Sequence, residues 1–356
     1  MNVENYEWSF KVIIVKDKKF WISAANVTAC LSVIYLHCNG VFWSFPKGIT
    51  WYTSNFIETF CYWAVPVFFM ISGATLLNYR ERYSTKEFLQ KRFTRTGIPF
   101  LFWSLVAIMF SLIVRNWPAE TLRGYISGII TTRYITIYWF FISLFAVYLS
   151  IPLLSAVNKE LRLKVFYYII ASAFIVQCVL PTIFALAAMP FNPELTVAAA
   201  GGYIIYILIG YAIANTDLTK RQRIIIYICS LIGWLIHFQG TTILSFSAGE
   251  LVGTFKGYLN FPAVMHATGV FTAFKYLKWD KIADRPVGKM ISMVSNYTFG
   301  IYLMHFYLVL LIPEIMHFDM KSIVWRLFGP IVIFIVCGLC SYIVSRIPYI
   351  KALIGA

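Results

Sequence analysis

The sequence predicts an all-α, polytopic integral membrane protein with about ten transmembrane helices and both termini in the cytoplasm. Hydrophobic residues make up 60% of the 356 residues and charged residues only 13%. A soluble domain of this size could not bury so much apolar surface. The apolar residues also form long runs, and most runs approach the roughly 20 residues that cross about 30 Å of hydrocarbon.

The backbone of a membrane span must satisfy its own hydrogen bonds, which favours helices here. A β-barrel would show short alternating segments instead. We expect spans at 20–36, 56–77, 98–114, 137–157, 165–186, 197–214, 224–238, 257–277, 291–312 and 323–344. The seventh run is short and the eighth is more polar than the others.

Charge predicts the orientation of these spans. Most of the 30 lysines and arginines fall in the tail before the first span, in the even-numbered gaps and after the last span. By the positive-inside rule these segments are cytoplasmic. We therefore expect a cytoplasmic tail over 1–19, one membrane domain over 20–346 and a cytoplasmic tail over 347–356.

The net charge of +15 has the same origin, since basic residues spread along one membrane face contact anionic lipid headgroups. No recognition motif accompanies them, so membrane lipids are expected partners and nucleic acid is not. The seven cysteines include no pair at metal-ligand spacing, which predicts no metal site.

Ionisable residues at membrane depth are costly and are therefore candidate functional residues. They are His37, Glu58, His237, His266, His305, Arg133 and Arg326. Asn26 and His37 are eleven residues apart in the first span, which places them on nearly the same helix face about 16 Å apart. Because imidazole titrates near neutrality, His37 is a candidate general base; the alternative is a histidine solvated by headgroups.

Glu58 begins the second span on the same predicted outer side. It is a candidate to orient His37 or to stabilise its charge, in the manner of catalytic pairs. The alternative is a solvated carboxylate at a helix N-terminus. Further along this span, Pro66 and Gly73 indicate a kink and close helix packing.

Lys91, Arg92 and Arg95 share one side of a helical turn in the gap before the third span. Such a cluster can bind the phosphates of a cytoplasmic ligand, or it is ordinary positive-inside charge. In the ninth span, Tyr302 and His305 are three residues apart and share a face. We expect that face to point into the bundle.

Several segments, in this order, make the chain similar to membrane acyltransferase family 3, the bacterial envelope O-acyltransferases. They are the first-span stripe ending at His37, 65–73, 91–99, 138–152 including Trp139, 206–211 and 297–305. The family's first-span motif is a basic residue, ten residues and a histidine. His37 matches the histidine, whereas Asn26 occupies the basic position. Arg92 and Arg95 match the family's arginine-rich entry to the third span.

The resemblance implies an O-acyltransferase of the bacterial cytoplasmic (inner) membrane. The donor is acyl-CoA, acetyl-CoA before succinyl-CoA, and the acceptor is a hydroxyl of an extracytoplasmic glycan, such as an exopolysaccharide or a lipid-linked glycan. It implies a catalytic role for His37, and Glu58 is the second catalytic candidate. The donor-binding candidates are Asn26, Lys91, Arg92 and Arg95, and the further pocket candidates are Tyr302, His305 and Trp139.

Two other classes of function fit part of the pattern. A transporter or flippase of lipid-linked sugar also uses many spans, but no internal repeat is evident and carboxylates at membrane depth are scarce. A non-catalytic membrane scaffold is the other alternative, and Asn26 in place of a basic residue favours it. The sequence does not determine the oligomeric state.

Overall fold

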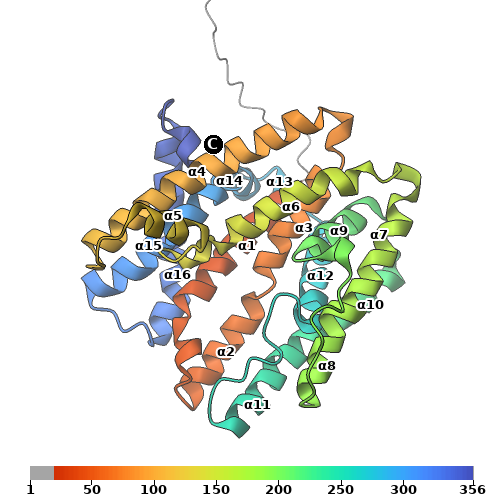
Figure 1. Cartoon of the computed structure of the whole chain (residues 1–356), viewed down its shortest axis with the longest axis horizontal. Coiled ribbons are helices and arrows are strands. Elements are labelled where there is room, and N and C mark those ends of the chain that lie inside the picture. Colours follow the sequence, from red (N-terminus) through yellow and green to blue (C-terminus); the bar gives the residue numbers. More distant parts are fainter. Residues whose placement is uncertain (1–19, 356) are drawn as a thin grey trace, which may run out of the picture.

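The computed structural model describes residues 20–355, and all regular secondary structure within them is helical (Figure 1). Eight helical segments are long and apolar enough to cross a membrane: 20–44, 49–81, 85–113, 136–156, 159–186, 220–248, 298–316 and 323–345. This confirms the all-α, polytopic prediction. The predicted sixth and eighth spans correspond to two shorter helices. The tail predicted over 1–19 lies outside the described residues.

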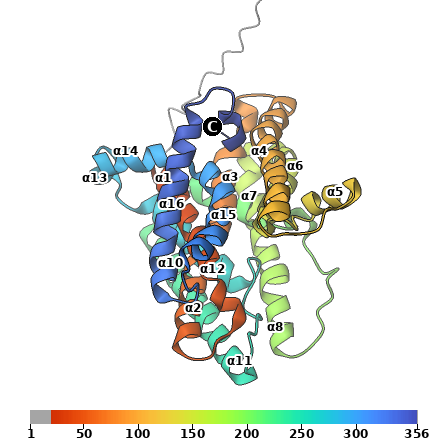
Figure 2. The same cartoon turned by 90° about the vertical axis from the view of Figure 1, so that its left-hand side faces the viewer.

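The bundle is built around α1, which contacts α2, α3, α12, α14, α15 and α16 (Figures 1 and 2). The α-helices are α1 (Phe20–Cys38), α2 (Ile49–Cys61), α3 (Ala64–Leu76), α4 (Thr85–Ile113), α5 (Leu122–Ile130), α6 (Trp139–Ala156), α7 (Lys159–Ala173), α8 (Leu180–Leu186), α9 (Ile204–Asn215), α10 (Lys220–Leu235), α11 (Thr241–Ala248), α12 (Phe261–Tyr276), α13 (Asp280–Ala283), α14 (Pro286–Val294), α15 (Thr298–Met316) and α16 (Ile323–Ser345).

Several predicted boundaries were wrong, and three of them have a clear local cause. The helix of the third span begins at Thr85 rather than near 98, because the Ser84 side chain caps it by accepting a hydrogen bond from the Glu87 N–H. The seventh span is not short, since one π-helical turn (Ile236–Gly240) joins α10 to α11. The ninth begins at Thr298, and the residues before it form the separate helix α14.

The predicted kink in the second span is confirmed. Its helix breaks at Tyr62 and Trp63, between α2 and α3, and Pro66 lies in the first turn of α3. Proline has no N–H to donate to the carbonyl four residues earlier, here that of Tyr62, and its ring crowds that carbonyl. The break therefore follows from the proline.

Close helix packing in the same segment is also confirmed. A Cβ placed on Gly73 of α3 would collide with the backbone of Ile207 in α9, and one on Gly210 of α9 would collide with the backbone of Met70. Glycine at both positions lets the two backbones touch, as small residues do in membrane helix pairs.

We predict that Gly73→Ala destabilises the protein by about 1–3 kcal/mol, because backbone atoms cannot yield to the added methyl group. The measurement is the thermal unfolding midpoint of the detergent-solubilised protein. Gly97→Ala in α4 is the matched control, since a Cβ there would meet no atom within 4 Å. An unchanged midpoint for Gly73→Ala would contradict the packing argument.

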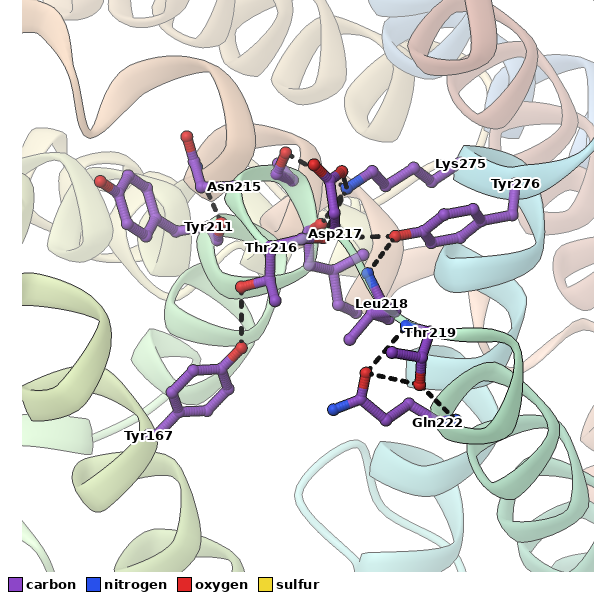
Figure 3. A network of polar contacts seen from close by, with 12 residues as sticks. Tyr167, Tyr211, Asn215, Thr216, Asp217, Leu218, Thr219, Gln222, Lys275 and Tyr276 are labelled. Atoms are coloured by element: carbon purple, nitrogen blue, oxygen red, sulfur yellow. Dashed lines mark hydrogen bonds and ion pairs between the residues drawn. The ribbon is translucent and has the colours of Figure 1, made fainter.

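At least one basic residue of the predicted cytoplasmic side has a structural role, because it donates hydrogen bonds to the carbonyl groups at the end of a helix. Lys275 Nζ donates to the carbonyl oxygens of Ile213 and Thr216, each at 2.8 Å, where α9 ends (Figure 3). The Tyr276 hydroxyl accepts from the Leu218 N–H at 2.6 Å in the same network. A cation at a helix C-terminus satisfies carbonyls that have no partner in the helix.

Candidate functional site

The imidazole rings of His37 and His305 lie against each other in the interior of the bundle. His37 Nδ1 and His305 Nε2 are 2.8 Å apart, and the two ring planes are inclined by only 20°, so the rings meet edge to edge. His305 is fully buried, and its Nδ1 faces the carbonyl oxygen of Tyr302 at 2.7 Å. The structure thus confirms that His305 points into the bundle and places it against the predicted base.

A cleft of about 570 Å³ opens beside His37. Its wall is formed by the end of α1, by residues 40–44, by the last turns of α15 and by the start of α16. The lining residues are His37, Cys38, Gly40, Val41, Ser44, Leu310, Pro313, Glu314, Phe318, Asp319, Met320, Lys321 and Trp325. The cleft is large enough for a small organic ligand and combines apolar walls with a few polar groups.

The histidine pair lies at the end of α1 and part-way along α15. His305 is seven residues into the 19-residue helix α15, and Met316 at the far end of that helix is eleven residues further on. At 1.5 Å per residue, this end lies about 16 Å beyond the histidine pair. The cleft opens toward this far end, since Leu310, Pro313 and Glu314 of the last turns of α15 line it together with His37.

The predicted basic cluster lies toward the other end of α15. Arg95 Nε donates to the Gly355 carbonyl at 3.1 Å, and Gly355 packs against the ring of Phe299. Phe299 is six residues before His305, so the two levels are separated by about 9 Å along the helix axis. Residues predicted to form a C-terminal tail thus pack on α4 next to the arginines.

Within the cluster the three cations differ. Lys91 Nζ pairs with Glu87 Oε1 of the preceding turn at 2.6 Å, and both side chains are exposed. Arg92 and Arg95 have no acidic partner among residues 20–355, and Arg92 Nε is buried without any hydrogen-bond partner. An anionic ligand would satisfy these two guanidinium groups.

A family model, described as an acyltransferase domain of acyltransferase family 3, matches residues 19–347. The chain belongs to acyltransferase family 3. This match covers nearly the whole chain and supports a membrane acyltransferase. No curated protein and no solved structure gives a significant match.

Glu58 does not contact His37 in this family 3 protein, contrary to the predicted pairing. Glu58 Oε1 forms an ion pair with Lys256 Nζ at 2.5 Å, and Oε2 accepts from Asn39 Nδ2 at 3.3 Å. Asn39 also donates to the carbonyl of Ser54 at 2.9 Å. Asn39 comes two residues after His37, so Glu58 holds the backbone segment that follows the histidine. The direct side-chain partner of His37 is His305.

The pairing was missed because Lys256 is far from Glu58 in the sequence. One signal was available: Lys256 lies in a predicted outer gap, where the positive-inside rule disfavours lysine. A lysine in a predicted outer gap whose side chain is also buried requires a specific partner.

Asn26 occupies the position where the family motif has a basic residue, and its amide nitrogen donates hydrogen bonds to a neighbouring part of the bundle. Asn26 Nδ2 donates to Thr298 Oγ1 at 2.8 Å and to the Ser295 carbonyl at 3.2 Å. These bonds join α1 to the start of α15. Asn26 thus has a structural role, and its predicted contact with the donor stays a prediction.

Tyr302 and Trp139 were predicted to line the pocket, but neither belongs to the lining of the cleft. The Tyr302 hydroxyl donates to the Ile137 carbonyl at 2.7 Å. Trp139 packs against the rings of Tyr203 and Tyr258. Tyr302 lies on α15 between Phe299 and His305, and so between the level of Arg95 and the histidine pair.

Proposed function

We propose that the protein transfers an acyl group, with acetyl as the first candidate, from cytoplasmic acyl-CoA to a hydroxyl of an extracytoplasmic glycan, in the cytoplasmic membrane of a bacterium. The observation that carries this proposal is the placement of His37. It lies in the wall of a cleft, while Arg95, which has no acidic partner among residues 20–355, lies near Phe299, a level about 9 Å along α15 from the histidine pair.

In the proposed reaction the acceptor hydroxyl enters the cleft and His37 removes its proton. The alkoxide oxygen attacks the thioester carbonyl, the carbon–sulfur bond breaks, and the proton passes to the departing thiolate of CoA. General-base catalysis by a positioned imidazole contributes about 10²- to 10⁴-fold. Transfer through an acyl group carried by His37 itself is the alternative course.

The donor phosphates would bind at Arg92 and Arg95, with the pantetheine arm running along α15 toward His37. The lining of the cleft includes none of Lys91, Arg92 and Arg95. The passage between the two levels therefore stays a prediction, and Tyr302 would have to move aside for it to open.

The function is tested with purified protein, radiolabelled acetyl-CoA and glycan from the bacterial envelope. We expect label on the glycan, or slow hydrolysis of acetyl-CoA when no acceptor is present. Binding of acetyl-CoA without turnover would indicate a non-catalytic scaffold. Absence of binding would favour the transporter and overturn the proposal.

For the donor site, we predict that Arg92→Gln and Arg95→Gln each raise the KM for acyl-CoA about tenfold or more with a smaller effect on kcat. A hydrogen bond to a charged group contributes about 1.5–3 kcal/mol, and 1.4 kcal/mol is a factor of ten. Steady-state kinetics provide the measurement.

Lys91→Gln is the matched control for these variants, because Glu87 already neutralises Lys91 on the exposed face of the same helix. It should change KM by much less than the arginine variants. If all three variants behave alike, the cluster acts only as diffuse positive charge and does not bind the phosphates directly.

A further inference from the structure

The hydrogen bonds of His305 define where its protons are. Its Nδ1 faces two carbonyl oxygens, that of Tyr302 at 2.7 Å and that of Ile301 at 3.3 Å. Carbonyl oxygens only accept, so Nδ1 carries a hydrogen. No carboxylate contacts this fully buried ring among the described residues, and an unpaired buried cation is costly. His305 is therefore neutral, and its Nε2 has a free lone pair.

This assignment also determines the tautomer of His37. Its Nδ1 lies 2.8 Å from the lone pair of His305 Nε2, so His37 Nδ1 must carry the hydrogen that it donates. In a neutral His37 the other nitrogen, Nε2, then has the lone pair. His37 Nε2 has no hydrogen-bond partner among residues 20–355, and it is not among the fully buried unpartnered atoms. It is thus the basic nitrogen accessible from the cleft.

The other histidines in the spans show that this arrangement is specific. His237 Nε2 is buried without any partner, and His266 Nε2 lies 3.4 Å from the Phe60 carbonyl. Neither lines the cleft. Of the histidines in the described spans, only His37 has its second ring nitrogen open to the cleft.

We propose that His305 is a positioning residue that fixes His37 as the Nδ1–H tautomer and so presents an unprotonated Nε2 to the acceptor hydroxyl. The chain of donors runs from His37 Nδ1–H to His305 Nε2, and from His305 Nδ1–H to the Tyr302 carbonyl. His305 Nε2 takes the place that the carboxylate holds in Ser-His-Asp triads, where it accepts the Nδ1–H of the base and orients its ring. The Tyr302 carbonyl in turn orients His305. The catalytic part of this proposal rests on the proposed function.

The first test does not depend on activity. The full-length protein, with ¹⁵N-labelled histidine and reconstituted in lipid, is examined by NMR, and the His37 signals are assigned from the His37→Gln variant. We expect a protonated Nδ1 and an unprotonated Nε2 at neutral pH. A protonated Nε2 with an unprotonated Nδ1 would overturn the proposal, whether or not transfer is observed.

The second test is kinetic. We predict that His305→Leu lowers kcat at least 100-fold and changes the KM for acyl-CoA little, because the donor site is intact while the base loses its orientation. His305→Gln should recover most of the rate, because its side-chain oxygen can accept the His37 Nδ1–H. Equal loss in both variants, or no loss in His305→Leu, would contradict the positioning role.

These outcomes separate the two proposals. If the wild-type protein transfers no acyl group, the proposed function fails, but the tautomer measured by NMR still decides the state of His37. If the wild type is active and His305→Leu equals it, the function stands and the positioning role fails. If His305→Leu does not fold, the wild-type NMR spectrum and His305→Gln still provide the answer.

Discussion

Replacement of His37 by glutamine is expected to reduce acyl transfer by roughly 10²- to 10⁴-fold, the contribution of a general base. Glutamine keeps a donor for His305 Nε2 but has no group that can take a proton at neutral pH. The variant should fold normally, because His37 is only partly buried and borders a cleft. Transfer is measured with radiolabelled acetyl-CoA and glycan acceptor.

His317→Asn is the control for this variant. His317 is exposed, follows α15 and has a positive φ of 52°, a conformation that asparagine tolerates. It should have wild-type activity. Transfer at the normal rate by His37→Gln would remove the base from the mechanism. A labelled acyl-protein that forms only when His37 is present would instead favour the covalent course.

The second large effect is expected at the Glu58–Lys256 ion pair. Both side chains are almost fully buried, and the ammonium also lies over the rings of Phe42, Trp43 and Tyr62. Burial lowers the pKa of Lys256, and the Glu58 carboxylate opposes this shift. Removing one partner of a buried pair leaves an uncompensated charge and costs about 3–5 kcal/mol.

We therefore predict that Lys256→Met lowers the thermal unfolding midpoint strongly, whereas Glu58→Gln combined with Lys256→Met recovers much of the loss. The double variant is informative because apolar or neutral replacement of a whole buried pair is often tolerated. Lys159→Met, which breaks the exposed pair with Glu81, should have little effect. A midpoint for Lys256→Met equal to the wild type would show that the pair is not important for stability.

The main features of the fold could be predicted from the sequence because the bilayer limits the choices. Long apolar runs must be helices, since no water is available to their backbones, and Pro66 must disturb the helix that contains it. The boundaries were harder, because a side-chain cap at Ser84 and a π-helical turn at 236–240 extend helices past the apolar runs.

Part of the candidate site could likewise be predicted from the sequence, and part could not. His37 stood out because an imidazole in a span is costly, and the arginines stood out because they cluster before a membrane entry. The partners of His37 and Glu58 could not be read from spacing. His305 is 268 residues from His37, and Lys256 is 198 residues from Glu58. Contacts over such separations depend on how the helices pack.

The chain by itself therefore determined an all-helical membrane domain and singled out His37, since these follow from local composition and from the cost of polar groups in hydrocarbon. The order of its motifs indicated the family. Only the tertiary structure decided which side chain contacts His37 and which residue balances Glu58. The reason is physical: a hydrogen bond or an ion pair acts within about 3 Å, and helix packing alone brings such distant residues that close.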